Sequence, residues 1–247
     1  MGDVRTAVVT GAASGIGAAV AARLAADGLR VVAADIDVEG AGRVAEALPG
    51  DLRARRVDVT DGDSIAALRA DVHASVGVPR VLVNCAGWDE FGMFADTDRA
   101  FWEKVVAINY LGVVAMTHAF LPDLTGGGDG TEPRVVNIAS DAGRGGSMGE
   151  TVYAGAKGGV IAFTKSLARE AARDGVTANA VCPGPTDTPL FEGFPDKIRG
   201  ALVKAIPLRR LADPADIAHA VSFFVSPGAS YVTGQVLSVS GGLTMNG

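Results

Sequence analysis

Thr10-Gly11-Ala12-Ala13-Ser14-Gly15-Ile16-Gly17 directly follows the apolar run Ala7–Thr10 and opens a long Ala-rich stretch. Glycine is required where the backbone turns sharply between a strand and a helix, and where main chain must approach a pyrophosphate closely. A helix that begins here offers unpaired N–H groups and a positive dipole end to phosphates. The G-x-x-x-G-x-G spacing between a strand and a helix therefore predicts a dinucleotide-binding turn, with a tight turn that binds nothing as the alternative.

Outward from this turn, short β-branched runs alternate with longer Ala-rich stretches along the whole chain. We predict strands at Ala7–Thr10, Arg30–Ala34, Arg53–Val57, Val81–Asn84, Arg134–Ala139, Thr177–Cys182 and Val236–Val239. We predict helices near Ile16–Asp27, Gly40–Leu48, Asp63–Ser75, Asp98–Leu121, Val152–Asp174 and Pro214–Phe224. Several strand candidates are apolar without alternation, which is typical of strands covered on both faces. The pattern predicts an α/β fold: one Rossmann-type, doubly wound parallel sheet of about seven strands with helices on both faces.

No repeat or linker divides the chain, so we expect residues 1–247 to form a single NAD(P)-binding domain. The Gly-rich stretch Gly126–Gly130 predicts a surface loop. The stretch Pro185–Pro207 holds four prolines, and we predict irregular backbone there. Because long irregular connections often cover a binding site, we expect a substrate lid at residues 188–210.

Composition argues against several classes of protein. The net charge of −6 disfavours a nucleic-acid binder, because phosphate contacts need clustered Lys and Arg. The two cysteines, Cys85 and Cys182, fit a reduced cytoplasmic compartment better than a disulfide scaffold. The three histidines do not cluster with Cys, Asp or Glu at ligand spacing, so we predict no metal site. Apolar runs end well short of about 18 residues, so we expect no membrane span.

Asp35 ends the second predicted strand, roughly 20 residues past the glycines. A carboxylate at this place can accept hydrogen bonds from the adenosine ribose hydroxyls. The same charge repels a 2′-phosphate, and Ser14 stands where a basic residue could have met that phosphate. The sequence therefore favours NAD over NADP. The alternative is that Asp35 simply ends a strand.

Tyr153 and Lys157 stand four residues apart in Tyr153-Ala-Gly-Ala-Lys157, so a helix would place them on one face. A tyrosine has a pKa of about 10 and is a poor base near neutrality. A nearby ammonium stabilises the phenolate, and together with a positive nicotinamide ring it could bring the phenol pKa towards 7. A helix with a solvated lysine is the alternative for the pair taken alone.

The motifs along the rest of the chain favour a catalytic role for Tyr153 and Lys157. In order, the chain shows Thr10-Gly-x-x-x-Gly-Ile-Gly17, Asp58-Val59, Asn84-Cys-Ala-Gly87, Asn109, Ser140, Tyr153-x-x-x-Lys157 and Pro183-Gly-Pro-Thr-Asp-Thr188. This ordered set resembles the short-chain dehydrogenase/reductase family over essentially the whole length. The resemblance implies hydride transfer between nicotinamide and a secondary alcohol or ketone, catalysed by Asn109, Ser140, Tyr153 and Lys157.

The resemblance implies a role for each of these four residues. Tyr153 would exchange a proton with the substrate oxygen, and the Ser140 hydroxyl would donate to the same oxygen. Lys157 would lower the tyrosine pKa and bind the nicotinamide ribose. Asn109 would hold a water for proton relay, or bond a backbone carbonyl, or both.

The resemblance also assigns contacts to the dinucleotide. They are Gly11, Ser14, Gly15, Ile16, Gly17, Asp35, Asp58, Val59, Asn84, Ala86, Gly87, Tyr153, Lys157, Pro183, Gly184, Thr186 and Thr188. Asp58 and Val59 would flank the adenine. Cys85 departs from the family pattern, which usually has a second asparagine there. Because that position mainly supports the central sheet, we expect only a small effect on stability. A redox role for Cys85 is disfavoured, because a buried thiol is usually inert.

Four segments narrow the substrate. They are Gly87-Trp88-Asp89, Ser140-Asp141-Ala142, Cys182–Thr188 and Ser238–Gly247. They resemble family members that oxidise a cyclic β-hydroxyacyl-CoA such as 2-hydroxycyclohexanecarboxyl-CoA. On this basis we expect Trp88, Ser140, Arg144 and Phe191 to contact the substrate. We also expect Arg144, Arg199 or Arg209 to meet the CoA phosphates.

Other functions stay open at this point. A 3-oxoacyl-[acyl-carrier-protein] reductase or a broad alcohol dehydrogenase would carry the same residues, and a non-catalytic NAD-sensing regulator could share the fold. A sensor has no need to keep Ser140, Tyr153 and Lys157 together. The family resemblance further implies a homotetramer.

Overall fold

The computed structural model describes residues 4–126 and 132–245. Its strands are β1 (Thr6–Thr10), β2 (Arg30–Asp35), β3 (Leu52–Arg56), β4 (Val81–Asn84), β5 (Arg134–Ile138), β6 (Thr177–Pro183) and β7 (Val236–Val239). They form one parallel sheet in the order β3-β2-β1-β4-β5-β6-β7. This arrangement confirms the predicted doubly wound α/β fold. The predicted loop at Gly126–Gly130 lies, beyond Gly126, outside the described residues.

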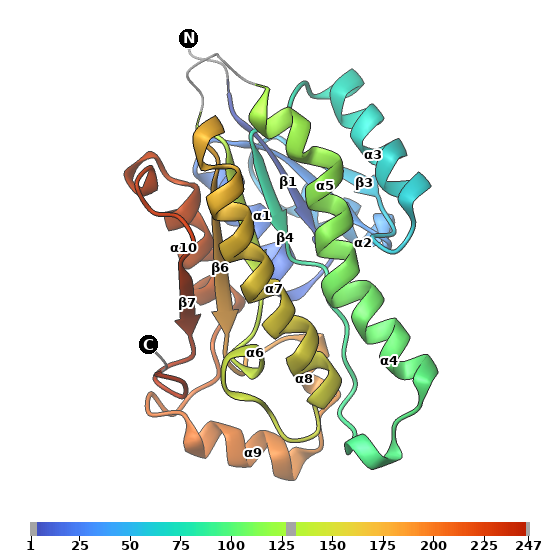
Figure 1. Cartoon of the computed structure of the whole chain (residues 1–247), viewed down its shortest axis with the longest axis vertical. Coiled ribbons are helices and arrows are strands. Elements are labelled where there is room, and N and C mark those ends of the chain that lie inside the picture. The colour runs from blue at the N-terminus through green and yellow to red at the C-terminus, as the bar shows by residue number, and fades with distance from the viewer. Residues whose placement is uncertain (1–3, 127–131, 246–247) are drawn as a thin grey trace.

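Helices cover both faces of the sheet (Figure 1). The α-helices are α1 (Gly15–Ala26), α2 (Val38–Ala47), α3 (Gly62–Ser75), α4 (Arg99–Val106), α5 (Gly112–Thr125), α6 (Ala142–Gly145), α7 (Thr151–Glu170), α8 (Pro189–Glu192), α9 (Asp196–Ala205) and α10 (Pro214–Val225). One apolar core lies between the sheet and α1, α2 and α10, with Leu24 and Phe224 at its centre. The other lies under α3, α5 and α7, around Leu68 and Phe120. Because both faces are covered, β1, β4, β5 and β6 are buried along their whole length.

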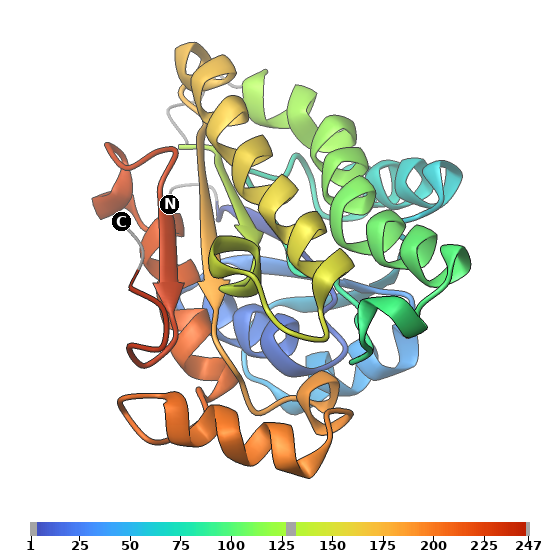
Figure 2. The same ribbon diagram turned by 60° about the horizontal axis from the view of Figure 1, so that its bottom comes forward.

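The stretch between β6 and α10 differs from the prediction of irregular backbone. It contains α8 and α9, and α9 lies across the end of the molecule to which β6 points (Figure 2). The prolines do not break these helices because Pro189 occupies the first turn of α8 and Pro195 precedes α9. A proline at a helix start loses no hydrogen bond, since its missing N–H would be unpaired there anyway.

The predicted helix at Asp98–Leu121 is continuous from Arg99 to Thr125 and contains a π-helical turn at Ala107–Leu111. By length and composition alone this helix could cross a membrane, against our expectation of no such segment. A core helix of a globular domain meets the same two criteria. Here Val113, Met116 and Phe120 are buried in the cores beside the sheet.

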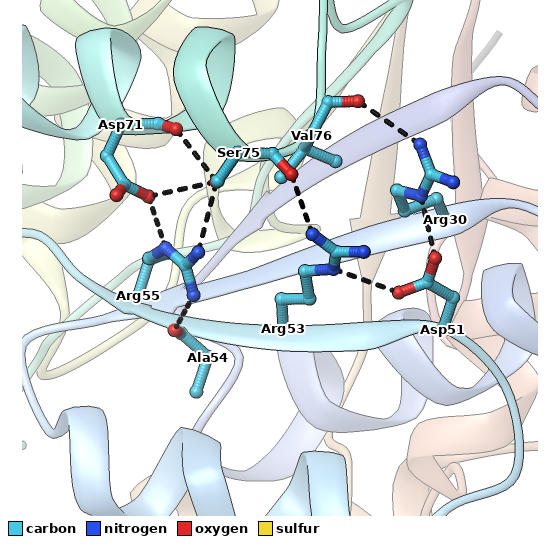
Figure 3. A network of polar contacts seen from close by, with 8 residues as sticks. All are labelled: Arg30, Asp51, Arg53, Ala54, Arg55, Asp71, Ser75 and Val76. Carbon is cyan, nitrogen blue, oxygen red and sulfur yellow. Dashed lines mark hydrogen bonds and ion pairs between the residues drawn. The ribbon is translucent and has the colours of Figure 1, made fainter.

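The edge strand β3 is rich in arginine and is held by ion pairs (Figure 3). Arg30 and Arg53 both pair with Asp51, at 2.6 Å and 3.1 Å. Arg55 pairs with Asp71 of α3. Charged side chains along an exposed strand discourage pairing with a second chain.

Candidate active site

A cavity of about 670 Å³ opens at the carboxyl ends of the strands. Its walls come from the segments that follow each of the strands β1 to β7, together with α7, α8 and α9. The sheet order reverses between β1 and β4, and such a switch point is where parallel α/β sheets bind ligands. Most of the predicted site residues line this cavity: Gly11, Ser14, Gly15, Ile16, Gly17, Asp35, Asp58, Val59, Ala86, Gly87, Trp88, Ser140, Tyr153, Lys157, Pro183, Gly184, Thr186, Thr188 and Phe191.

The glycine turn after β1 is packed so tightly that only glycine fits at two of its positions. A Cβ on Gly17 would lie 2.0 Å from the Gly11 carbonyl oxygen. Gly11 itself has a φ of 68°, and a Cβ there would lie 2.8 Å from the Cα of Ala86. No side chain caps the start of α1, and its first turn holds no acidic residue. The turn can therefore present backbone N–H groups to a phosphate.

Asp35 lies where β2 ends and faces the cavity. Its two carboxylate oxygens accept hydrogen bonds from the backbone N–H groups of Ala13 and Asp37, both at 2.9 Å. These bonds hold the carboxylate beside the glycine turn and leave further lone pairs for a ligand. Asp58, at the same end, accepts hydrogen bonds from the side chain and backbone of Thr60, which lower its pKa.

Tyr153 and Lys157 lie on one face of α7, with the Lys157 Nζ 5.6 Å from the centre of the tyrosine ring. Lys157 is buried and donates to the Ile138 carbonyl oxygen at 2.9 Å. Burial lowers the pKa of Lys157 to about 8. Ser140 follows β5 and hydrogen-bonds the Tyr153 hydroxyl. These side chains therefore meet at one wall of the cavity.

We predicted that Lys157 lowers the pKa of Tyr153, but the surroundings of the phenol raise this pKa. Burial of the phenol and the nearby carboxyl groups of Glu150 and Asp89 raise the pKa of Tyr153 above its usual value, whereas the Ser140 hydrogen bond lowers it. The sequence argument considered only positive charges, those of Lys157 and the nicotinamide ring. It omitted two carboxyl groups that the fold brings to the same place.

Asn109 lies in the π-helical turn, is fully buried, and is not among the cavity-lining residues. Its Oδ1 accepts from the Trp88 N–H at 3.2 Å, while its Nδ2 donates to the Trp88 carbonyl at 2.6 Å and to the Val105 carbonyl at 2.9 Å. Asn109 thus ties the segment after β4 to the long helix. Of the two roles predicted for Asn109, these contacts match the hydrogen bond to a backbone carbonyl group.

Two further residues lie away from their predicted contacts. The Nδ2 of Asn84 donates to Thr117 at 3.0 Å and to Asn137 at 2.8 Å, which ties β4 to α5 and β5 rather than placing Asn84 in the cavity wall. Arg144 donates to the Ser238 hydroxyl at 2.7 Å and also stays outside that wall. Hydrogen-bond partners that are distant in the sequence direct both side chains away from the cavity wall, and a sequence pattern does not reveal such partners.

Asp89 and Glu150 received no role in the sequence analysis, yet both approach Tyr153. Glu150 lines the cavity, and it precedes Tyr153 by three residues, a spacing that puts two side chains on one helical face. That spacing could have identified Glu150. Asp89 comes from a distant segment, and no local pattern points to it.

The segment predicted as a lid supplies an apolar wall. Phe191 and Phe194 lie 5.4 Å apart between ring centres, and Phe194 also lies 5.5 Å from Phe91. Leu190 and Leu202 extend the same wall. The substrate end of the cavity is thus apolar on the side of α8 and α9. Whether this segment opens and closes stays a prediction.

Comparison with known proteins agrees with this geometry. The family model described as enoyl-(acyl carrier protein) reductase matches residues 11–244. The (3R)-3-hydroxyacyl-CoA dehydrogenase of Mus musculus is 37% identical over 251 residues, 97% of this chain and 96% of that protein. The cis-4-hydroxycyclohexanecarboxylate dehydrogenase of Sinomonas cyclohexanicum is 42% identical, with 97% and 96% covered. The 3-oxoacyl-[acyl-carrier-protein] reductase of Vibrio harveyi is 37% identical, with 98% of both covered.

These relatives match almost the whole chain, and so does the family model. The glycine turn and the Tyr153–Lys157 face line one cavity, which lies at the switch point of the parallel sheet. The chain therefore belongs to the short-chain dehydrogenase/reductase family, and it is an oxidoreductase that acts on CH–OH groups.

Proposed function

We propose that this enzyme uses NAD to oxidise the secondary alcohol of a β-hydroxyacyl thioester, with a cyclic β-hydroxyacyl-CoA as its substrate. The observation that carries the proposal is that Ser140, Tyr153 and Lys157 line the same cavity as Asp35 and the glycine turn. The relative named for 3-hydroxyacyl-CoA supports the β-hydroxyacyl thioester, and the relative named for 4-hydroxycyclohexanecarboxylate supports a six-membered ring.

The residues present fit a dinucleotide. Gly11 and Gly17 allow the turn to close tightly without side chains, and the uncapped start of α1 offers N–H groups to a diphosphate. Asp35 and Asp58 would hold the adenosine end, and Pro183, Gly184, Thr186 and Thr188 would border the nicotinamide end. When bound, NAD supplies the hydride acceptor.

The chain's own residues would move the proton. The Tyr153 phenolate would accept the proton of the substrate hydroxyl as the C–H hydride leaves, which yields a ketone and a neutral phenol. The Ser140 hydroxyl would donate to the substrate oxygen and stabilise its developing charge. Lys157, anchored on the Ile138 carbonyl, would hold the nicotinamide ribose and favour the phenolate.

The direct test is a spectrophotometric screen with NAD and NADP against cyclic and linear β-hydroxyacyl-CoAs. We expect formation of NADH with at least one cyclic substrate. The relative named as a 3-oxoacyl-[acyl-carrier-protein] reductase supports a second candidate, reduction of a 3-oxoacyl thioester with NADPH. Turnover only in that direction and with that cofactor would replace the first proposal by the second.

The two directions should differ in how their rates depend on pH. Because burial and neighbouring carboxyl groups raise the pKa of Tyr153 above its usual value, the phenol is mostly protonated from about pH 6 to pH 10. Alcohol oxidation needs the phenolate, so its kcat/KM should rise with pH across this range, whereas ketone reduction needs the phenol and should stay nearly constant. Initial rates in both directions over this range of about four pH units check this. A flat profile for alcohol oxidation would contradict the assignment of the base.

The Asp35 carboxylate should impose a preference for NAD. Two like charges about 4 Å apart repel by about 4 kcal/mol at an effective dielectric of 20, so we expect kcat/KM with NAD to exceed that with NADP by about 10²- to 10³-fold. Asp35→Asn should lower this ratio at least about tenfold. The control is Asp37→Asn, because Asp37 is a nearby carboxylate outside the cavity wall. A wild type that prefers NADP would overturn the use of Asp35.

We also propose that the enzyme forms a homotetramer in the cytoplasm. The exposed apolar side chains Leu111, Phe223 and Leu237, on the long helix, α10 and β7, support burial against further subunits.

A further inference from the structure

Two carboxyl groups near Tyr153 are not used by the proposed reaction: Glu150 lines the cavity, and Asp89 is buried outside the cavity wall. Asp89 follows β4, and Glu150 stands immediately before α7. Their backbones are tied together, because the Gly92 N–H donates to the Gly149 carbonyl at 3.0 Å. Gly149 has a φ of 82°, and a Cβ there would lie 2.2 Å from the ring of Phe91. The two segments therefore have little freedom to separate.

Asp89 is in an unusual state for a carboxylate. It is 7% exposed, so its carboxyl group is almost wholly removed from water. The Glu150 carboxyl group is its hydrogen-bonding neighbour, and a buried carboxylate beside a second acidic group is costly. Burial and the charge of Glu150 raise the pKa of Asp89 to about 7, with Lys157 acting in the opposite direction and the adjacent Glu90 adding to the rise.

Glu150 is the partner that faces the cavity. It lines the wall beside Tyr153 and accepts a hydrogen bond from the Ser147 hydroxyl. Burial raises the pKa of Glu150, whereas hydrogen bonds with Ser147 and Asp89 lower it. Two carboxylates cannot donate to each other, so the bond between Glu150 and Asp89 exists only when one of them carries a proton. Together the two groups hold at least one negative charge near neutrality.

The rest of the cavity wall does not offset this charge. Among the charged side chains of the described residues that line it, Lys157 is the single cation, opposed by Asp35, Asp58, Asp141 and Glu150. Lys157 is buried and already donates to the Ile138 carbonyl. A carboxylate on the substrate would meet no other cation in this wall and would lie close to Glu150.

We propose that the Asp89–Glu150 pair is a specificity determinant: it admits a ring whose acyl group is uncharged, as in a thioester, ester or amide, and it rejects the same ring with a free carboxylate. The inference rests on the proposed function and deepens it. It agrees with a substrate of the kind in the name of the hydroxyacyl-CoA relative, and it predicts that hydroxycyclohexanecarboxylate, the free acid in the name of the other relative, binds this chain poorly.

The test uses binding rather than turnover. Cyclohexanecarboxamide and cyclohexanecarboxylate have nearly the same shape, and neither carries the reacting hydroxyl. Calorimetric titration of the NAD-saturated protein at pH 8 should give a dissociation constant at least about 30-fold larger for the carboxylate, given the like charge nearby. Glu150→Gln keeps the shape and an acceptor for Ser147, and it should reduce the ratio at least about tenfold. The substitution should change the dissociation constant of the carboxylate much more than that of the carboxamide, whereas a loss of packing would change both.

Glu90→Gln is the matched control, because Glu90 is an exposed glutamate next to Asp89. It should leave the ratio unchanged. Asp89→Asn should lower the ratio in the same direction as Glu150→Gln. In the wild type the ratio should also fall as the pH drops from 8 to 6, because the pair gains a proton below a pKa of about 7. In Glu150→Gln this pH dependence should be much weaker.

Two results would overturn the proposal. They are equal dissociation constants for the two probes, and no measurable binding of the carboxamide. Failure of the proposed function looks different. In that case no β-hydroxyacyl-CoA gives NADH. The ratio of the two dissociation constants is measured independently of this result and tests only the role of the Asp89–Glu150 pair.

Discussion

Tyr153→Phe is expected to lower kcat by about 10²- to 10⁴-fold, the usual contribution of a positioned general acid or base. Phenylalanine keeps the ring on α7 and removes only the hydroxyl that hydrogen-bonds Ser140. The binding of NAD should change little, because the glycine turn and Asp35 stay intact. Steady-state formation of NADH and calorimetric titration with NAD measure the two quantities.

The control for this variant is Tyr110→Phe. Tyr110 packs against Gly159 of α7, the helix that carries Tyr153, and is not among the cavity-lining residues. The Tyr110→Phe variant should therefore keep near wild-type turnover. If Tyr153→Phe retained more than about a tenth of wild-type kcat, the hydroxyl would not be the acid or base. The hydride-transfer mechanism would then need another proton acceptor.

Gly17→Ala should abolish dinucleotide binding more severely than any side-chain change at the site. The added Cβ would lie 2.0 Å from the oxygen and 2.6 Å from the carbon of the Gly11 carbonyl. Both are backbone atoms, so relief requires the turn itself to move. We expect the dissociation constant for NAD to rise at least about 100-fold, which corresponds to about 2.7 kcal/mol. The midpoint of thermal unfolding should also fall.

Gly42→Ala is the matched control for this substitution. Gly42 lies in α2, and a Cβ there would meet nothing within 4 Å. Alanine favours a helix over glycine by up to about 1 kcal/mol, so this variant should be at least as stable as the wild type and should bind NAD normally. Binding of NAD by Gly17→Ala within about threefold of wild type would show that the turn does not contact the diphosphate.

Hydrophobic pattern alone predicted the strands well. The predicted bounds of β4 and β7 agree with the structure, β3 is shifted by one residue, and the other strands differ by one residue at one end. This agreement arises because strands covered on both faces must be continuously apolar, and this is visible in neighbouring residues. Helices α8 and α9 were missed because prolines, read as breakers, stand at helix starts where they are compatible with helix.

The residues alone predicted the parallel α/β sheet, the glycine turn with Asp35, and the shared face of Tyr153 and Lys157. Each depends on the order and spacing of residue types along the chain, which the sequence displays directly. The tertiary structure alone turned Asn84, Asn109 and Arg144 away from the cavity and brought Asp89 beside Glu150. Those placements depend on partners from distant strands and helices. The orientation of a polar side chain follows from which distant groups satisfy its hydrogen bonds and charge, and only the packed chain sets those groups.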